Sequence, residues 1–138
     1  MLLCSMTAVN AQTDYNARQA SNYLSEAQRY ISQAEGYERD ADSYNRKAEG
    51  YERDAQYYAR EQASCLRSAE SYARNKQYDK AKTQASYAAS AADKAKTRLE
   101  WAATARDNAK TRLRWAATAR DNAKTRLQWA ASALSKAK

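Results

Sequence analysis

The sequence predicts an all-α fold, a long antiparallel two-helix coiled-coil hairpin in which Ala/Tyr heptads pack against Ala/Leu heptads. Composition is the first of three observations behind this prediction: the 138 residues include no Pro, no Phe and only two Gly, as expected of long helices. The second is a seven-residue recurrence of Ala and Tyr, and the third is a single break in that recurrence. The mean hydropathy of −1.03 also suits a disordered chain, but strictly periodic apolar residues indicate packing.

The first eleven residues predict a signal peptide that is removed from the mature protein. A short apolar run leads to a small-x-small pattern at residues 9–11, which fits cleavage before Gln12. The basic start of such a signal is missing, which suggests that a few upstream residues lie outside this sequence. Cys4 gives weak support to a lipoprotein signal, and an ordinary chain terminus is the alternative. We therefore expect a secreted or periplasmic protein whose mature hairpin is residues 12–138.

A helix is expected over residues 14–74, because small and aromatic residues alternate along one of its faces. In heptad notation the alanines take position a and the tyrosines take position d, three residues later. The alanines are Ala20, Ala27, Ala34, Ala41, Ala48 and Ala55, and the tyrosines are Tyr23, Tyr30, Tyr37, Tyr44, Tyr51 and Tyr58. Arginine recurs at position f, on the opposite side, so that side is expected to face solvent.

A second helix is expected over residues 78–137, with Leu at position a and Ala at position d. The Leu positions are Leu99, Leu113, Leu127 and Leu134, and Arg106 and Arg120 replace Leu between them. A unit that begins KTRLxWAA starts at Lys96, Lys110 and Lys124. Both halves of the chain therefore repeat every two heptads, or about 21 Å of helix rise.

A turn is expected at residues 75–77, because Tyr72 and Tyr78 are six residues apart, whereas a continuing seam needs a spacing of three or four. The residues around it, YARNKQYDKAKTQA, resemble the turn between the two helices of a tetratricopeptide repeat. The resemblance extends over residues 69–92 and implies a helical hairpin. The turn glycine of that family is absent and both flanking helices are too long for a repeat of about 34 residues, so peptide binding is not implied.

Antiparallel packing about residue 75 pairs positions whose numbers sum to about 150, and the two helices match under this rule. Each seam Ala of the first helix meets an Ala of the second, as in Ala34 with Ala116 and Ala48 with Ala102. The alternate layers are Tyr23 with Leu127, Tyr37 with Leu113, Tyr51 with Leu99, Tyr30 with Arg120 and Tyr44 with Arg106. In the last two layers a guanidinium is expected to lie on a Tyr ring, which contributes about 0.5 to 2 kcal/mol.

Opposite charges flank the seam in the same register. The expected pairs are Glu26 with Arg126, Asp40 with Arg112, Asp54 with Arg98, Glu38 with Lys110 and Glu52 with Lys96. Exposed ion pairs contribute little free energy, so these are expected to select register and orientation. A single unbroken helix in an intermolecular antiparallel dimer would use the same pairs, and it is the main alternative to the hairpin.

The chain lacks most side chains on which catalysis and metal binding depend. It has no His, and of its two Cys only Cys65 would remain after cleavage, so no disulfide within the mature chain is expected. A lone Cys on a helical face is more often a small core residue than a bridge between chains. Acidic neighbours such as Glu38 and Asp40 point in different directions on a helix and fit a solvated surface. We therefore expect a non-enzymatic protein with no cofactor, no metal and no small-molecule substrate.

Basic charge is concentrated in the second half of the chain. Residues 1–75 carry 9 Lys/Arg against 11 Asp/Glu, and residues 76–138 carry 15 against 5. Such a basic helix could bind an anionic polymer or a membrane surface, whereas export argues against nucleic acid. The favoured expectation is a structural or scaffolding protein that forms a homo-oligomer, such as a four-helix bundle of two hairpins, because a seam of alanines buries little area.

Three tryptophans, two glycines and the two seam arginines are the candidate interaction residues. They are Trp101, Trp115, Trp129, Gly36, Gly50, Arg106 and Arg120. Trp115 and Trp101 lie opposite Gly36 and Gly50, and a Gly inside an exposed helix costs about 1 kcal/mol relative to Ala. We hypothesise that each glycine leaves a notch that admits an indole across the seam, or lets a second hairpin press the indole there. A glycine merely tolerated in a duplicated surface repeat is the alternative.

Overall fold

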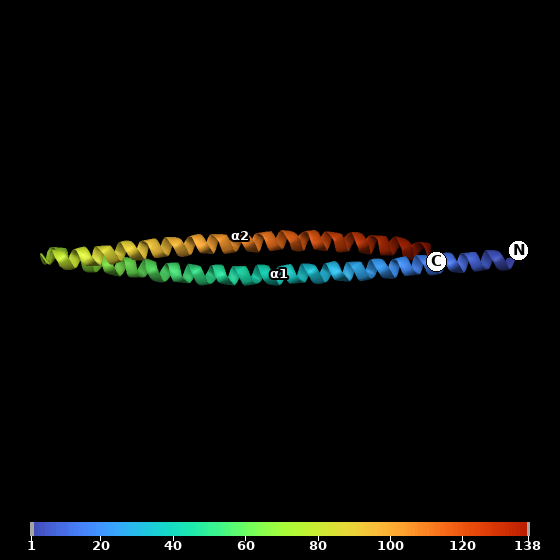
Figure 1. Cartoon of the computed structure of the whole chain (residues 1–138), viewed down its shortest axis with the longest axis horizontal. Coiled ribbons are helices and arrows are strands. Elements are labelled where there is room, and N and C mark those ends of the chain that lie inside the picture. Colours follow the sequence, from blue (N-terminus) through green and yellow to red (C-terminus); the bar gives the residue numbers. More distant parts are fainter. Residues whose placement is uncertain (1, 138) are drawn as a thin grey trace. The chain divides into compact units, whose positions relative to one another are not determined.

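Two long helices joined by a short turn dominate residues 2–137, the part of the chain that this computed structural model describes. Helix α1 spans Leu2–Arg74 and α2 spans Tyr78–Lys136. The two helices pack side by side and run in opposite directions (Figure 1). No strand occurs between residues 2 and 137. The predicted all-α antiparallel hairpin is therefore confirmed.

The helix bounds differ from the expected ones mainly at the start of α1. This helix begins at Leu2, not near residue 14, so the backbone of the expected signal peptide is helical from Leu2 onward. The side chains of residues 1–10, including Cys4, lie outside the described part. Cleavage and a lipoprotein signal therefore stay predictions.

The inter-helix packing divides into two compact units. The terminal unit combines the chain up to Asp40 with the chain from Thr111 onward, and the turn unit is Ala41–Lys110. Each unit contains a stretch of α1 packed against a stretch of α2.

Alanine dominates the buried seam of each unit. Every buried hydrophobic residue within residues 11–137 is an alanine, and none of the large side chains there is fully buried. Ala34 packs with Ala116 and Ala119 in the terminal unit, and Ala48 packs with Ala102 and Ala105 in the turn unit. Side chains this small allow helix axes to approach at the near end of the usual range of about 8 to 10 Å. The apolar core is consequently thin.

Helix α2 turns a different face toward α1 than the sequence predicted. Ala105, Ala119 and Ala133, at position g, are buried together with the alanines at position d. The leucines at position a remain 44–55% exposed, so the leucines of the expected Tyr–Leu layers are only half-buried. The reason is that alanines at both d and g let the helix backbones meet between these two stripes. The leucines are then left at the edge of the contact.

A helix-capping motif makes the turn at residues 75–77. The N–H of Gln77 donates to the carbonyl of Tyr72 at 2.8 Å, and that of Lys76 donates to the carbonyl of Ala73 at 3.1 Å. These two bonds define a Schellman motif. Lys76 has a φ of 60°, in the left-handed region where this motif usually has Gly. The carbonyl of Gln77 then accepts the N–H of Ala81 at 3.0 Å and starts α2.

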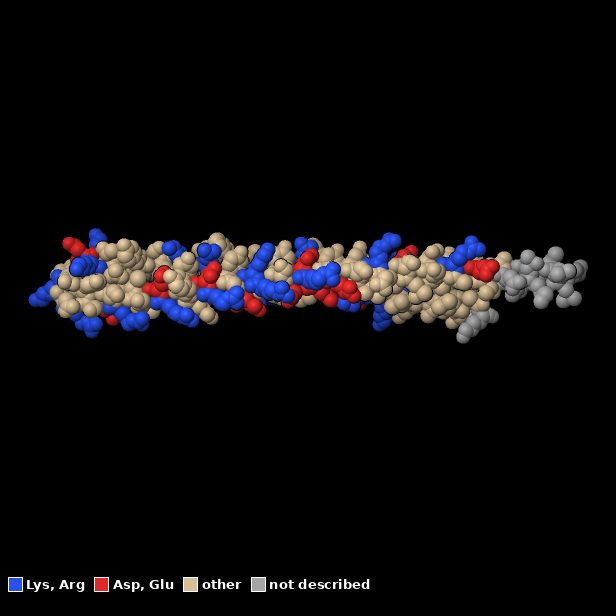
Figure 2. Space-filling model, turned by 90° about the horizontal axis from the view of Figure 1, so that it is seen from below, with Lys and Arg blue, Asp and Glu red and all other residues tan. Residues whose placement is uncertain are grey.

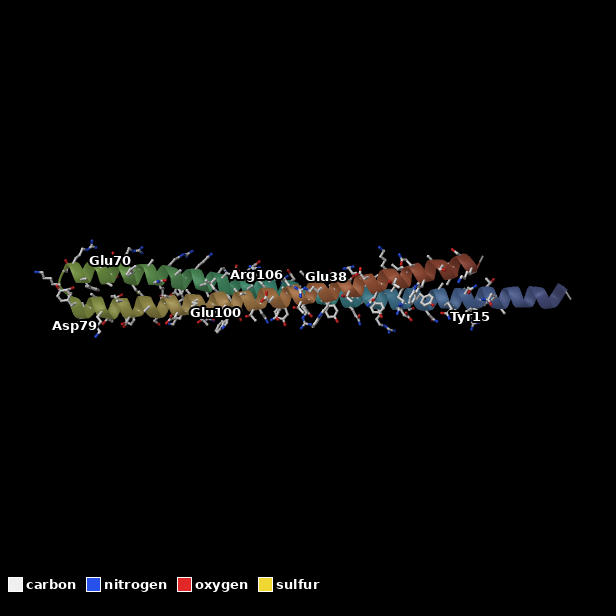
Figure 3. The ribbon with its side chains drawn as sticks, turned by 90° about the horizontal axis from the view of Figure 1, so that it is seen from above. Tyr15, Glu38, Glu70, Asp79, Glu100 and Arg106 are labelled. Atoms are coloured by element: carbon white, nitrogen blue, oxygen red, sulfur yellow. The ribbon has the colours of Figure 1, made fainter. Side chains whose placement is uncertain are left out.

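Charged residues support both helix ends at the turn. Arg74 lies in the last turn of α1. Asp79, labelled in Figure 3, lies in the first turn of α2. A cation at a helix C-terminus and an anion at an N-terminus both complement the helix dipole. The chain thus turns without the glycine of a tetratricopeptide repeat, because Lys76 adopts the conformation that a glycine would adopt at lower cost.

Replacing Lys76 by Gly is expected to stabilise the fold. A left-handed conformation costs a non-glycine residue about 1 to 2 kcal/mol, and the greater unfolded-state entropy of Gly offsets part of the gain. We expect Lys76→Gly to raise the free energy of unfolding by about 0.5 to 1 kcal/mol, measured by chemical denaturation. Lys76→Ala is the control, because it removes the charge and keeps the strained backbone. Equal stability of the two variants would contradict this account of the turn.

Candidate functional site

Three equivalent aromatic pairs link the two helices. They are Tyr23–Trp129 and Tyr37–Trp115 in the terminal unit and Tyr51–Trp101 in the turn unit. In each pair the ring centroids are 5.5 Å apart and the planes cross at 67–70°. Edge-to-face pairs of this kind contribute roughly 0.5 to 1.5 kcal/mol beyond area burial. The three indoles nevertheless remain 45–46% exposed. We name these six residues the aromatic face.

An arginine three residues before each tryptophan lies over the indole. The guanidinium carbons of Arg98, Arg112 and Arg126 are 4.3–4.5 Å from the ring centroids of Trp101, Trp115 and Trp129. This i, i+3 spacing places both side chains on one side of a helix. Part of the basic charge of α2 is therefore held against its own tryptophans.

Arg126 joins several of these contacts. Its Nε donates to Glu26 at 2.5 Å, and its guanidinium lies 5.7 Å from the ring centroid of Tyr30 as well as over Trp129. The expected ion pair between Glu26 and Arg126 is therefore present.

A groove opens beside each aromatic pair. We name the grooves after Trp129, Trp115 and Trp101, and their volumes are 410, 360 and 410 Å³. Each is lined by the Tyr and Trp of one pair, by a buried Ala and by a hydroxyl residue. The Ala residues are Ala133, Ala119 and Ala105, and the hydroxyl residues are Ser132, Thr118 and Thr104. Equivalent residues in successive grooves are 14 positions apart.

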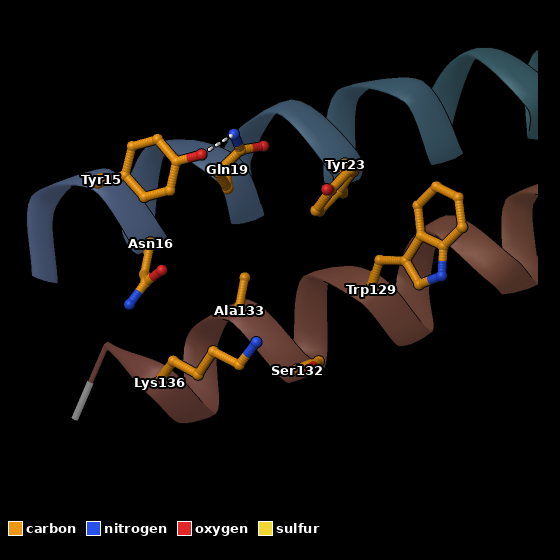
Figure 4. A pocket seen from close by; sticks show the side chains of 8 residues that line it. All are labelled: Tyr15, Asn16, Gln19, Tyr23, Trp129, Ser132, Ala133 and Lys136. Carbon is orange, nitrogen blue, oxygen red and sulfur yellow. Dashed lines mark hydrogen bonds between the residues drawn. The ribbon is translucent and has the colours of Figure 1, made fainter. Parts of the chain in front are cut away.

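The Trp129 groove shows how both helices contribute (Figure 4). Tyr15, Gln19 and Tyr23 of α1 line it from one side, and Trp129 and Ala133 of α2 line it from the other. The side-chain amide of Gln19 donates to the hydroxyl of Tyr15 at 3.0 Å, which fixes that end of the wall.

A second surface carries the leucines that the seam leaves out. Leu113 and Trp115 are two residues apart, which places them about 160° apart around α2, on opposite sides of the buried alanines. We name Leu99, Leu113, Leu127 and Leu134, with Arg106 and Arg120, the leucine face. Its leucines remain about half exposed.

The two arginines of the leucine face bind carboxylates of α1. Arg120 donates through Nε and Nη2 to the two carboxylate oxygens of Glu38, at 2.8 and 3.0 Å. Arg106 donates through Nε to Glu52 at 2.8 Å. Arg120, expected to stack on Tyr30, forms this two-point contact with Glu38, and Arg126 lies over the Tyr30 ring at 5.7 Å.

The expected lysine partners of Glu38 and Glu52 are replaced by these arginines. An arginine at the edge of the seam can reach a carboxylate with two parallel hydrogen bonds, which a lysine cannot do. The hydrogen bond from Arg120, opposed in part by desolvation, lowers the pKa of Glu38 below its usual 4.5. The same bond to Glu38 raises the pKa of Arg120 above its usual value.

The glycines do not receive the indoles within one chain. A Cβ built at Gly36 would meet only Nη2 of Arg39, and one at Gly50 would meet only Nη2 of Arg53, each at 3.8 Å. The indoles contact Tyr37 and Tyr51 instead. The notch hypothesis is therefore wrong for an indole of the same chain, and its second form, an indole pressed there by another copy, stays a prediction.

Charges of both signs lie at the surface. Figure 2 shows acidic side chains among basic ones on the face that it presents. Within α1, Asp42 and Arg46 also form an ion pair one turn apart. The inter-helix ion pairs of Arg106, Arg120 and Arg126 compensate part of the basic excess of the second half.

Two other kinds of site are absent from the described residues. Neither helix has, in that part of the chain, an apolar stretch that could cross a bilayer. No group of three or more His, Cys, Asp or Glu there could hold a metal ion. Cys65, expected to be a small core residue, is a free thiol that is only half-buried.

Comparison with family models, curated protein sequences and solved structures finds no match.

Acidification is expected to remove the contribution of the Glu38–Arg120 pair to stability. Because the folded-state pKa of Glu38 is lowered from 4.5, the stabilisation is fully present above pH 4.5 and is lost as the pH falls through the folded-state value. Glu38→Gln should therefore be less stable than the wild type at pH 7, and the difference should shrink at pH 3. Glu49→Gln, at an exposed position of the same helix, is the control. A difference between wild type and Glu38→Gln that does not change with pH would contradict this assignment.

Changing both glycines to alanine is expected to stabilise the helix. A Cβ at either position meets only the end of a flexible arginine, so each substitution should add about 1 kcal/mol from helix propensity. The emission maximum of the tryptophans should not move. A loss of stability or of self-association, together with a red shift in emission, would instead support a notch filled by another copy.

Proposed function

We propose that this protein is a non-enzymatic structural or scaffolding element that acts through self-association of its helical hairpins. The proposal rests on where the small and large apolar side chains lie: the small ones fill the core and the large ones are at the surface. The buried seam holds alanines, while Leu99, Leu113, Leu127 and all three tryptophans are 44–55% exposed. A helix whose apolar surface extends beyond one neighbour is typical of a helix that has a second neighbour.

The energetic balance requires many of these side chains to be covered together. Burying a Leu completely contributes about 1.5 to 3 kcal/mol, so covering the exposed half contributes roughly half of that. Association costs about 4 to 15 kcal/mol in lost freedom. Covering a single leucine therefore cannot offset the cost of association. A row of leucines that repeats every 14 residues supplies several such contacts at once.

A bundle of two hairpins is the simplest assembly of this kind. Neighbouring helices in such bundles run nearly parallel or antiparallel to each other and are joined by short loops. Each hairpin already supplies two of the four helices. The Glu–Arg pairs beside the leucines provide polar contacts that select one register among several.

The predicted signal peptide favours a structural role outside the cytoplasm. The small-x-small pattern at residues 9–11 is typical of a cleaved signal, so we propose a secreted or periplasmic location. A helical hairpin that self-associates would serve there as a spacer or a lattice element.

Binding of an anionic polymer or a membrane surface is the second candidate function. Residues 76–138 carry 15 Lys/Arg against 5 Asp/Glu, and this excess favours it. The two functions differ in their response to salt. Binding to a polyanion weakens steeply as salt rises, whereas self-association through apolar side chains persists.

The leucine face is expected to be required for self-association. Sedimentation equilibrium of the wild type, at low and high salt, should give the mass of two or more chains. Leu113→Ser combined with Leu127→Ser should lower the mass to that of one chain, because about 1.5 to 3 kcal/mol of apolar burial is lost per copy.

The control is Arg114→Ser combined with Gln128→Ser, which changes two exposed positions with the same 14-residue spacing and should leave the mass unchanged. Circular dichroism shows whether each variant remains helical. A wild type that stays monomeric, but binds polyphosphate or anionic vesicles at low salt, would replace the proposed function by the second candidate.

A further inference from the structure

We propose that the leucine face of one copy enters the aromatic grooves of a second copy. This proposal rests on self-association as the function and names the two surfaces that meet. The ligand of each groove is a leucine side chain of another hairpin, and the contact joins two different surfaces of the same protein.

The spacing of the leucines matches that of the grooves. In the terminal unit, Leu113 and Leu127 are 14 residues apart, and so are Trp115 and Trp129, which line the two grooves of that unit. Fourteen residues of helix rise about 21 Å. Two leucines of one copy can therefore enter two grooves of another at the same time. The turn unit carries one further equivalent of each, Leu99 and the Trp101 groove.

The Trp115 groove fits an apolar side chain better than an anion, whereas Lys136 lines the Trp129 groove and Lys47 lines the Trp101 groove. The Trp115 groove is lined by Gln33, Tyr37, Trp115, Thr118, Ala119 and Asn122, all of them uncharged. Its two aromatic rings and its buried alanine give it an apolar lining, and no cation lies in it to attract a phosphate or a carboxylate. Leucine is the large aliphatic side chain that the exposed surface of α2 offers at the matching period.

The two surfaces lie on opposite sides of the buried alanines of α2. A contact between two different surfaces is heterologous, and it leaves one leucine face and one set of grooves free at the ends of the assembly. Addition of copies can then continue, so the average mass should rise with protein concentration. Pairing of one leucine face with another would instead be isologous and would stop at a dimer.

A mixing experiment separates these arrangements. The leucine variant is Leu113→Ser with Leu127→Ser. The groove variant is Thr118→Arg with Ser132→Arg, which fills the Trp115 and Trp129 grooves from exposed positions. Its control is Gln128→Arg with Ser135→Arg, which adds the same charge at exposed positions outside the grooves and should assemble like the wild type. Circular dichroism confirms that each variant remains helical.

The proposal predicts that each variant alone is monomeric, because each has lost one of the two complementary surfaces. An equimolar mixture should form a one-to-one dimer, since intact leucines of one variant meet intact grooves of the other, and it should grow no further. Sedimentation equilibrium measures both masses.

Assembly of the groove variant alone would overturn this proposal and favour pairing between leucine faces, with self-association still standing. A mixture that stays monomeric, when the wild type assembles, would also overturn it. A monomeric wild type would remove the proposed function itself, and with it this inference.

Discussion

Close contact between alanines of the two helices is the interaction on which the rest of the structure depends. Ala34 and Ala48 of α1 are almost fully buried against alanines of α2, and so small a side chain lets the backbones approach. The cost of this geometry is a core with little apolar area. Large apolar side chains then have no place between the helices, and they line the edges of the contact.

The two edges of the contact between the helices carry different side chains. On one side, Tyr37 meets Trp115 edge to face and Arg112 lies over the indole, so rings and guanidinium groups form a firm wall. On the other side, leucines alternate with arginines that bind Glu38 and Glu52. One helix pair thus presents two chemically different surfaces, both repeating every 14 residues, which is the property that an assembling protein needs.

The sequence predicted the helices, the turn and the alanine layers, because all three follow from spacing alone. It did not predict that α2 buries position g, because Leu is more hydrophobic than Ala and its heptad spacing indicated a place in the seam. The choice depends on how closely two backbones approach, which is a property of both helices together. Lys76 was missed for a similar reason, since a left-handed lysine leaves no signal in composition. The grooves, too, need coordinates from both helices.

The measurement that tests the account most directly is a disulfide placed across the alanine seam. Ala48 and Ala102 pack in one cluster of the turn unit, so both can be changed to Cys in a chain whose Cys4 and Cys65 are Ser. After oxidation at low protein concentration, non-reducing mass analysis should show a bridge within single chains. Bridges that only join two chains, with yield falling on dilution, would contradict the hairpin and favour a dimer of unbroken helices.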